Sequence, residues 1–403
     1  MNSQILKTYQ RLLKSIPVDT HRFLFSKFNI NSRITGLIGP RGTGKTTMLL
    51  QFINERVDNK DECIYASLDN IYFSNNLLFN FIEELYEIDG IRYFFLDEVH
   101  KYKNWSQETK NAYDSFPDIK IIFSGSSSID LIKGAYDLSR RGTLYKLPGL
   151  SFREFIYFRT KQSFKTFAFN ELLACKNNDF EDIAGFKKLL GYFNEYLEYG
   201  FYPFVFEDKE HYHSKVLNII NKIIYEDIAS FYKLKTENLH YFKRILSYIS
   251  TIPPGSLSRN NISQKIGLDN KTVHHYLEIL QETGLVTLVK ENKSGSSILK
   301  RTEKIYLNNP NIYTAISKDI GFQFSTGTVR EIFFIDMIQN SGNKIYFSKV
   351  GDFTVAGYNF EIGGKNKTIK QIKDNLDTSL LVKDNILYKT KYEIPLYLFG
   401  FLY

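Results

Sequence analysis

Residues 39–47 read Gly39-Pro40-Arg41-Gly42-Thr43-Gly44-Lys45-Thr46-Thr47. They follow an apolar run at residues 34–38, which predicts a strand, and precede residues 48–52, which predict a helix. A Gly-rich loop between a strand and a helix is the arrangement of a P-loop, whose backbone N–H groups face nucleotide phosphates. We therefore expect these nine residues to bind ATP, with Lys45 on the phosphate oxygens and Thr46 on Mg²⁺. The alternative is a Gly-rich turn that matches by chance.

The sequence around this loop alternates between strand and helix patterns. A 3.6-residue period predicts helices at residues 1–16 and 77–86, and apolar runs predict strands at residues 63–68, 91–96, 119–123 and 144–148. This alternation predicts the α/β fold of a P-loop NTPase with a parallel sheet. With 403 residues, of which 43% are apolar, the chain is long enough for two or three folded domains.

Two carboxylates follow the run at residues 91–96, at the sheet edge where the P-loop strand also ends. These are Asp97 and Glu98. Ligands bind at the carboxyl ends of parallel strands, so we expect Asp97 to hold Mg²⁺ together with Thr46, and Glu98 to orient the attacking water. The alternative is a helix N-cap with a charged first turn.

Further strand ends supply candidates for phosphate sensing and charge stabilisation. Ser126 is our first choice for a hydroxyl that reads the γ-phosphate, and Ser124 is the second. Arg140 or Arg141, just before the last strand, would act as an arginine finger in its own subunit or in a neighbour. A Ser-rich helix cap and a pair of surface arginines are the alternatives.

Charge and cysteine content limit the classes of partner. The net charge is +8 and the pI is about 9.0, which suits a polyanion such as DNA or, alternatively, reflects a lysine-rich solvated surface. The two cysteines, Cys63 and Cys175, lie far apart and predict neither a disulfide framework nor a zinc site. Because we find no signal peptide and no membrane span, we expect a cytoplasmic protein without membrane contact.

Several motifs in this order resemble one family. The P-loop is followed by Leu-Asp-Glu-Val-His at residues 96–100 with Trp105 nearby, Ser-Gly-Ser-Ser-Ser at 124–128, Arg-Arg-Gly at 140–142 and Leu-Ser-Phe-Arg-Glu-Phe at 150–155. The chain resembles the bacterial and archaeal AAA+ ATPases whose C-terminal half carries a domain of unknown function. The resemblance implies an AAA+ domain at residues 1–160, followed by a helical, lid-like region at residues 161–250.

Residues 251–310 resemble a winged helix. Two helices with a turn at Gly267 are followed by strands at residues 284–290 and 304–307, joined by a basic hairpin. A winged helix would turn its second helix to a DNA major groove and its hairpin to the phosphates. The residues in those positions are Asn270, Lys271, Thr272 and His275 on the helix and Lys293, Lys300 and Arg301 in the hairpin. The alternative is a winged helix that only packs against protein.

Residues 311–403 resemble the nuclease fold of the PD-D/E-x-K type. The matching positions are Glu331, Asp352, Glu361 and Lys365. In that family the lysine stands two residues after the second acid, a position that Gly363 occupies here, and a shift of two residues moves an amine by about 7 Å along a strand. We therefore expect a degenerate nuclease-like domain that serves binding or assembly, with active cleavage as the alternative.

The combined expectation is a multidomain AAA+ ATPase with ATP and Mg²⁺ as cofactors, which couples its nucleotide state to a C-terminal module that binds DNA. Two alternatives remain open: a nucleotide-gated switch that engages protein partners with little turnover, and a DNA nuclease under ATP control. The sequence leaves the oligomeric state open, and a homo-oligomer is one expectation.

Overall fold

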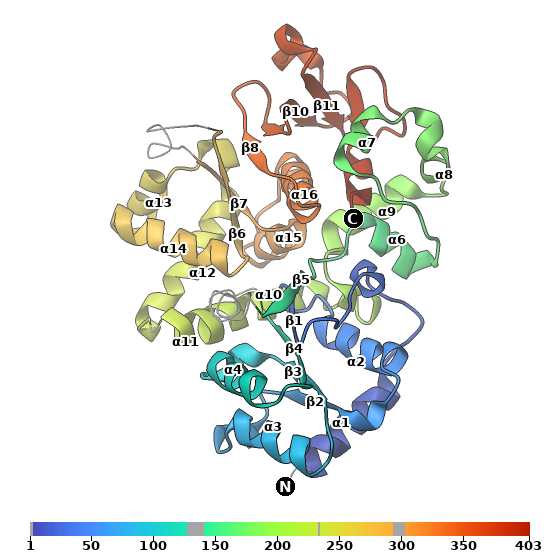
Figure 1. Ribbon diagram of the computed structural model, residues 1–403. Coiled ribbons are helices and arrows are strands. Elements are labelled where there is room, and N and C mark those ends of the chain that lie inside the picture. The colour runs from blue at the N-terminus through green and yellow to red at the C-terminus, as the bar shows by residue number, and fades with distance from the viewer. Residues whose placement is uncertain (1–2, 127–140, 233, 293–302) are drawn as a thin grey trace. The chain divides into compact units, whose positions relative to one another are not determined.

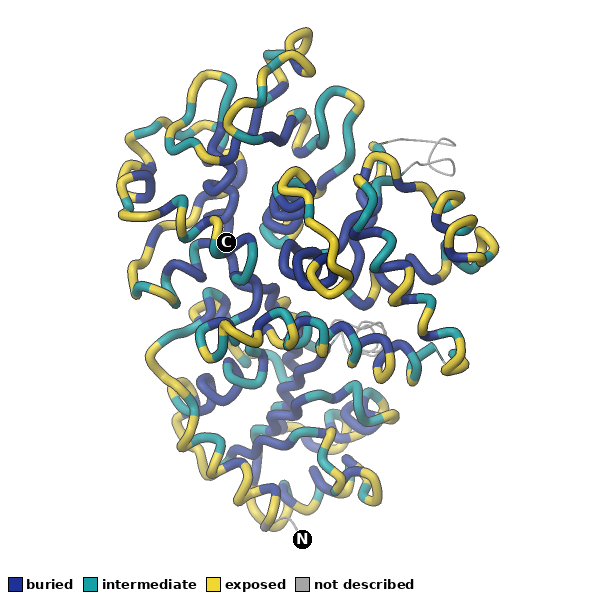
Figure 2. Tube along the Cα trace, turned by 180° about the vertical axis from the view of Figure 1, so that it is seen from behind, coloured by how far each residue is buried: buried dark blue, intermediate teal, exposed yellow. Residues whose placement is uncertain are grey.

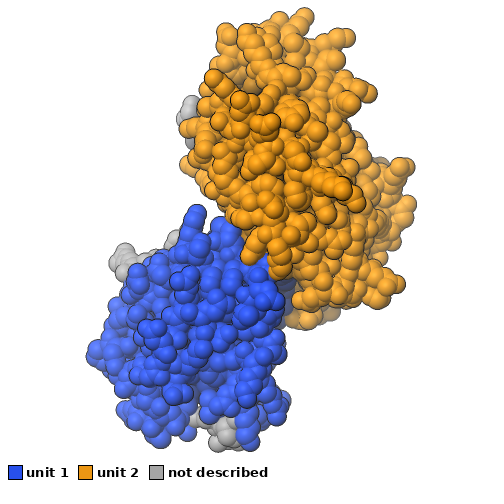
Figure 3. Space-filling view, turned by 90° about the vertical axis from the view of Figure 1, so that its right-hand side faces the viewer, with its two compact units in different colours: residues 1–149 blue, residues 150–403 orange. Residues whose placement is uncertain are grey.

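The chain folds as two compact units, residues 1–149 and residues 150–403 (Figure 3). The computed structural model describes residues 3–126, 141–232, 234–292 and 303–403. The division falls at residues 149 and 150, whereas the sequence predicted a boundary at 160. The ranges predicted as three further domains share one compact unit.

The first unit is built on a five-stranded sheet in the order β2-β3-β4-β1-β5, with neighbouring strands parallel (Figure 1). This confirms the predicted α/β fold with a parallel sheet. The strands are β1 Ile34–Ile38, β2 Cys63–Ser67, β3 Tyr93–Asp97, β4 Lys120–Gly125 and β5 Gly142–Lys146. Strands β1 to β4 are almost wholly buried, as expected for a sheet covered on both faces (Figure 2).

Four helices of the described residues cover the sheet: α1 Ser3–Ser15 and α2 Lys45–Arg56 on one side, and α3 Leu78–Glu87 and α4 Trp105–Ser115 on the other (Figure 1). The strand register brings the carboxyl ends of the strands to one edge. Ile38 is level with Gly125 and Lys146, and Asp97 is level with Ser67. The P-loop and the two carboxylates therefore meet at this edge.

The second unit combines helices with two small sheets. Helices α6 Phe152–Thr160, α7 Phe169–Ala174, α8 Glu181–Ala184 and α9 Leu189–Tyr199 come first. They are followed by α10 Tyr212–Lys222, which continues through the π-helix η7 Ile223–Ile228 into α11 Ala229–Tyr232, and then by α12 Thr236–Thr251. The elements expected for residues 251–310 are present: α13 Arg259–Ile266, α14 Asn270–Glu282, and the antiparallel strands β6 Val286–Lys290 and β7 Glu303–Leu307.

The C-terminal part of this unit holds α15 Pro310–Asp319, α16 Thr326–Asn340 and a sheet in the order β12-β11-β10-β9-β8. Its strands are β8 Ile345–Phe347, β9 Phe353–Val355, β10 Tyr358–Gly363, β11 Ser379–Lys383 and β12 Glu393–Pro395. Strands β8 to β10 pair antiparallel, and β10 to β12 pair parallel. Across the described residues, no helix combines the length and the apolar character that crossing a membrane requires.

Candidate active site

The P-loop is shaped by two glycines with different roles. Gly44 has a φ of 88°, in the left-handed region that favours glycine, and α2 begins at the next residue. A Cβ on Gly39 would lie 2.1 Å from the Leu147 carbonyl oxygen, so only glycine fits there. No side chain caps α2, so its first backbone N–H groups are left for an anion.

Lys45 lies back over this loop. Its Nζ donates hydrogen bonds to the carbonyl oxygens of Gly39 and Pro40, each at 2.9 Å. The side chain is buried. The ammonium is thus already held beside the loop amides, where phosphate oxygens would compete with these two carbonyls for it.

Asp97 is the centre of the site and is only 2% exposed. Thr46 Oγ1 donates to its Oδ2 at 2.5 Å, and Tyr65 Oη donates to the same oxygen at 2.7 Å. The Ser124 hydroxyl and the Glu98 backbone N–H, at 3.0 Å, donate to Oδ1. Burial and the nearby Asp97 charge raise the pKa of Tyr65, so this phenol stays a donor.

The Thr46 hydroxyl and the Asp97 carboxylate therefore form the oxygen pair predicted for Mg²⁺. Hard oxygen ligands from one carboxylate and one hydroxyl, with phosphates to complete the shell, match the preference of this ion. The donor chemistry at this edge fits the cofactor.

Glu98 sits at the end of β3 with a left-handed φ of 52°, a conformation that costs a non-glycine residue energy. Its Oε2 lies 3.4 Å from His100 Nε2, and Arg41 Nη2 lies 3.3 Å from the same nitrogen. The His100 side chain is 5% exposed, and that of Glu98 is 25% exposed. His100 therefore lies between contacts to Glu98 and to the P-loop arginine, and the Glu98 side chain is partly exposed.

Two residues of this site were not predicted. Arg22 is buried, and its guanidinium donates to the carbonyl oxygens of Thr43 at 2.5 Å, Pro148 at 2.8 Å and Gly149 at 3.0 Å. No local pattern signals such a contact, because Pro148 lies 126 positions away. The sequence does contain a signal for Tyr65, because this residue lies in a strand predicted to end at the same edge as Asp97.

The serine and arginine predictions have mixed outcomes. The Ser124 hydroxyl, the second choice, donates to Asp97. Ser126, the first choice, is buried directly after β4. Arg140 lies outside the described residues. Arg141 precedes β5, whose Gly142 is level with Ile34 at the opposite end of β1 from the P-loop.

This placement corrects the prediction of Arg141 as a finger in its own subunit. Its Nη2 lies 3.7 Å from Asp114 Oδ1, and its guanidinium lies 5.5 Å from the centre of the Tyr113 ring. The length of the sheet separates it from the phosphate loop. A role in a neighbouring subunit stays a prediction.

Residues 31–156 match a family model described as an AAA domain. Most of this match lies in the first unit, and residues 31–149 are called the AAA domain below. Residues 190–322 match a second model, described as Domain of unknown function (DUF8612). A comparison with curated proteins finds no match.

Several solved structures are similar at low sequence identity. AMPPCP-bound DnaA from Aquifex aeolicus is 18% identical over 70% of this chain and 88% of its own, with a TM-score of 0.28. DnaA bound to AMPPCP and single-stranded DNA is 17% identical over the same shares, with a TM-score of 0.27. C. elegans PCH-2 is 18% identical over 39% of this chain and 45% of its own, with a TM-score of 0.25. TM-scores this low do not show a common fold. The assignment of an AAA domain to residues 31–149 therefore depends on the family model and on the geometry of this domain.

The residues predicted to contact DNA lie mostly at the start of α14. Asn270, Lys271 and His275 are exposed. Thr272 is engaged within the helix cap, since its hydroxyl and backbone N–H both bond the Asp269 carboxylate. The hairpin residues Lys293, Lys300 and Arg301 lie outside the described residues. DNA contact stays a prediction.

The nuclease-like residues gather around β9, β10 and α16, with one correction. Lys365 is exposed, and Lys367 instead forms the ion pair with Glu361. A Cβ on Gly363 would lie 2.4 Å from the Lys367 side chain, so Lys367 folds back over the position where the family has its lysine. The Gly-Gly turn after β10 explains the difference, because it returns the chain toward Glu361.

Each acid of this cluster already has a partner. Tyr306 Oη donates to Glu331 Oε2 at 2.6 Å, and the Ile362 backbone N–H donates to Asp352 Oδ2 at 2.8 Å. Burial, with the Asp352 charge second, raises the pKa of Glu331 to about 7. Within the described residues, no group of three or more His, Cys, Asp or Glu side chains is placed to hold a metal ion.

Proposed function

We propose that the AAA domain binds ATP with Mg²⁺ and hydrolyses the bond between its β- and γ-phosphates. The observation that carries the proposal is the 2.5 Å contact between Thr46 Oγ1 and Asp97 Oδ2. It joins the end of the P-loop to the end of a strand 51 residues later, in the arrangement that nucleotide-bound Mg²⁺ requires. Bound there, the ion neutralises charge on the β- and γ-phosphates.

The protein groups have separable tasks. The backbone N–H groups at the start of α2 hold the phosphates, and Lys45 transfers its hydrogen bonds from the Gly39 and Pro40 carbonyls to phosphate oxygens. Glu98 orients and polarises the water that attacks the γ-phosphorus, and ADP leaves with the former bridging oxygen. His100, beside the Glu98 carboxylate, limits the directions in which it points.

We further propose that the nucleotide state is coupled to DNA binding by the second unit. Exposed Asn270, Lys271 and His275 at the start of α14, on a chain of net charge +8, support this role. The Asp269 carboxylate lies among them and caps the helix, which disfavours phosphate at that position. Base-edge contact in a groove is therefore favoured over simple phosphate attraction.

We propose that the nuclease-like part does not cleave DNA. One oxygen of each acid is already engaged by the protein: Lys367 pairs with Glu361, and Tyr306 and the Ile362 backbone N–H bond Glu331 and Asp352. Metal-dependent nicking that disappears in Asp352→Ala would contradict this.

The test is steady-state Mg²⁺-dependent ATP hydrolysis by the wild type, Glu98→Gln and Lys45→Ala, with and without duplex DNA at low salt. We expect Glu98→Gln to lower kcat by roughly 10²- to 10⁴-fold with ATP affinity retained, and Lys45→Ala to lose ATP binding. DNA stimulation that is absent in Glu98→Gln would support the coupling.

Three results would change the proposal. Unchanged ATP affinity of Lys45→Ala in a calorimetric titration would contradict the P-loop assignment. Tight ATP binding without turnover in any condition would replace the ATPase by a nucleotide-gated switch. A wild-type rate that DNA leaves unchanged would contradict the coupling alone.

A further inference from the structure

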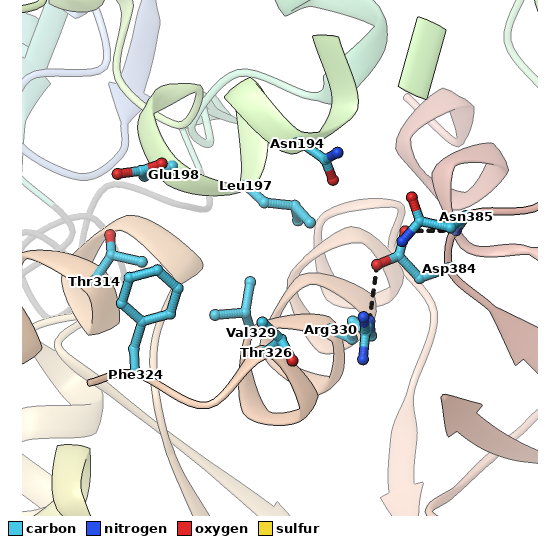
Figure 4. A pocket seen from close by; sticks show the side chains of 10 residues that line it. All are labelled: Asn194, Leu197, Glu198, Thr314, Phe324, Thr326, Val329, Arg330, Asp384 and Asn385. Carbon is cyan, nitrogen blue, oxygen red and sulfur yellow. Dashed lines mark hydrogen bonds and ion pairs between the residues drawn. The ribbon is translucent and has the colours of Figure 1, made fainter. Parts of the chain in front are cut away.

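A cavity of about 220 Å³ lies within the second unit. Helices α9 and α16 form its opposite walls, and the turn after β11 closes one end. Figure 4 shows Asn194 and Leu197 coming from α9, and Val329 and Arg330 coming from α16, on facing sides. The floor is apolar, because Leu197 and Val329 are buried, whereas Asn194 at the rim is exposed.

Arg330 is fixed in this cavity by a buried carboxylate. Its Nε donates to Asp384 Oδ2 at 2.8 Å, and the two side chains are 18% and 6% exposed. The other oxygen of Asp384 accepts from the Asn385 backbone N–H at 2.8 Å. Asp384 is therefore held on both oxygens and orients the guanidinium through Nε alone.

The outer edge of this guanidinium has unused donors. Among the described residues, neither Nη1 nor Nη2 of Arg330 has a hydrogen-bond acceptor. A Cβ on Gly364 would lie 3.3 Å from Nη1, so the glycine leaves space beside that nitrogen. The Arg330 side chain is 18% exposed, and a planar pair of free N–H groups matches the two oxygens of a carboxylate or a phosphate.

Further donors surround the same space. The Asn194 and Asn385 amides and the Thr326 hydroxyl make no side-chain hydrogen bond with any described residue, and all three line the cavity (Figure 4). Phe324 adds to the apolar wall. The volume is below the roughly 300–1,000 Å³ of sites for drug-sized ligands, so the occupant is small.

We propose that this cavity is a binding site for a small organic anion. The carboxylate or phosphate of the ligand pairs with Nη1 and Nη2 of Arg330, the amides at the rim donate to it, and a short apolar body contacts Leu197 and Val329. The ligand joins α9 to α16 and to the turn after β11.

The probes are inorganic phosphate and succinate, titrated calorimetrically into the full chain. Phosphate also suits the P-loop, so the titrations use Lys45→Ala as the parent. We expect this parent to bind at least one probe, and the preferred probe to distinguish a phosphate ligand from a carboxylate ligand. Arg330→Gln in this parent should weaken that binding at least tenfold, and Arg244→Gln, which removes an exposed arginine of the same unit, should change it less than twofold.

Arg330→Gln leaves Asp384 buried without its cation and can impair folding, so a second variant is needed. Asn194→Asp adds a negative charge at the exposed rim without touching the ion pair. It should weaken binding at least threefold with unchanged circular dichroism. The proposal is overturned if the Lys45→Ala parent binds neither probe at millimolar concentration, or if Asn194→Asp and folded Arg330→Gln both bind as the parent does. Equal weakening by Arg244→Gln and Arg330→Gln would also overturn it, since that indicates non-specific charge attraction.

Discussion

Asp97 shows how much of the candidate site depends on a single side chain. A carboxylate with four hydrogen-bond donors is fixed in one rotamer, and its position then fixes the Thr46 hydroxyl beside it. Tyr65 contributes from β2, the strand paired with β3. Its hydroxyl would not contact the nucleotide, so its effect on the reaction passes through Asp97.

Tyr65→Phe removes one of these donors and little else. We expect the Mg²⁺ concentration for half-maximal hydrolysis to rise about tenfold, because partners of a metal-binding carboxylate typically contribute 10- to 100-fold to metal affinity. The measurement is the ATPase rate as a function of Mg²⁺ at saturating ATP. Tyr93→Phe is the matched control, because Tyr93 lies in β3 and its hydroxyl has no hydrogen bond among the described residues. Equal Mg²⁺ dependence of both variants would show that Tyr65 is only structural.

The sequence could predict the position of residues whose chemistry and local context coincide. The loop at residues 39–47 and the Asp97-Glu98 pair follow strands, and the structure places both at the same edge of the sheet. Arg22 could not, since its role depends on three carbonyl oxygens that only the folded chain brings to it. Ser124 and Ser126 were both candidates. Which of them contacts Asp97 depends on the face of the sheet to which each side chain points, and Ser124 is the one that bonds Asp97.

At the scale of elements, the turn after β10 decides the chemistry of the acid cluster. The spacing from Glu361 to Lys365 predicted, for an extended strand, that this lysine lies too far along the chain. The chain instead turns back and brings Lys367 to Glu361. Periodicity predicts β10 and its hairpin partner, yet it carries no information on the path of a Gly-Gly turn. The resemblance pointed to Lys365, whereas the lysine beside Glu361 is Lys367.

Glu331 on α16 gives this cluster a pH dependence. Burial raises its pKa from the ordinary 4.5 to about 7, so the unfolded chain ionises first as pH rises. The stability associated with Glu331 is complete below pH 4.5, is lost between pH 4.5 and 7, and amounts to about 3 kcal/mol at most. Asp352 and Glu361 add to the shift, and Tyr306 and Lys304 oppose it.

Glu331→Gln should therefore stabilise the protein at pH 8 by about 1–3 kcal/mol and change little at pH 5, because glutamine resembles the neutral acid and can still accept from Tyr306. The measurement is urea unfolding at both pH values with a chelator present. Glu237→Gln, at a carboxylate that is 72% exposed, is the control. A loss of stability at pH 8 in Glu331→Gln would mean that the ionised carboxylate is needed there.

At the scale of the whole molecule, the candidate nucleotide site adjoins the segment where the first unit ends. The Leu147 backbone N–H donates to the Ile38 carbonyl at 2.7 Å, directly before the P-loop. Arg22 then links the Thr43 carbonyl of the loop to the carbonyls of Pro148 and Gly149. The second unit begins at the next residue, Leu150. The loop and this connecting segment therefore share one buried guanidinium.

We expect Mg²⁺ and a non-hydrolysable ATP analogue to slow amide hydrogen exchange severalfold in residues 145–152. Nucleotide fixes the loop carbonyl at Thr43, which restrains Arg22 and, through it, the segment at residues 148–149. In Arg22→Lys, which keeps the charge but not the forked donors, this slowing should be mostly lost, while ATP affinity falls less than tenfold.

Arg33→Gln is the matched control: Arg33 donates to the Tyr113 and Phe116 carbonyls beside the start of β1, away from the loop. If Arg22→Lys kept the full nucleotide effect, that effect would have to reach residues 145–152 through other residues. If Arg33→Gln lost it as well, the effect would reflect general stability of the AAA domain and not a specific connection.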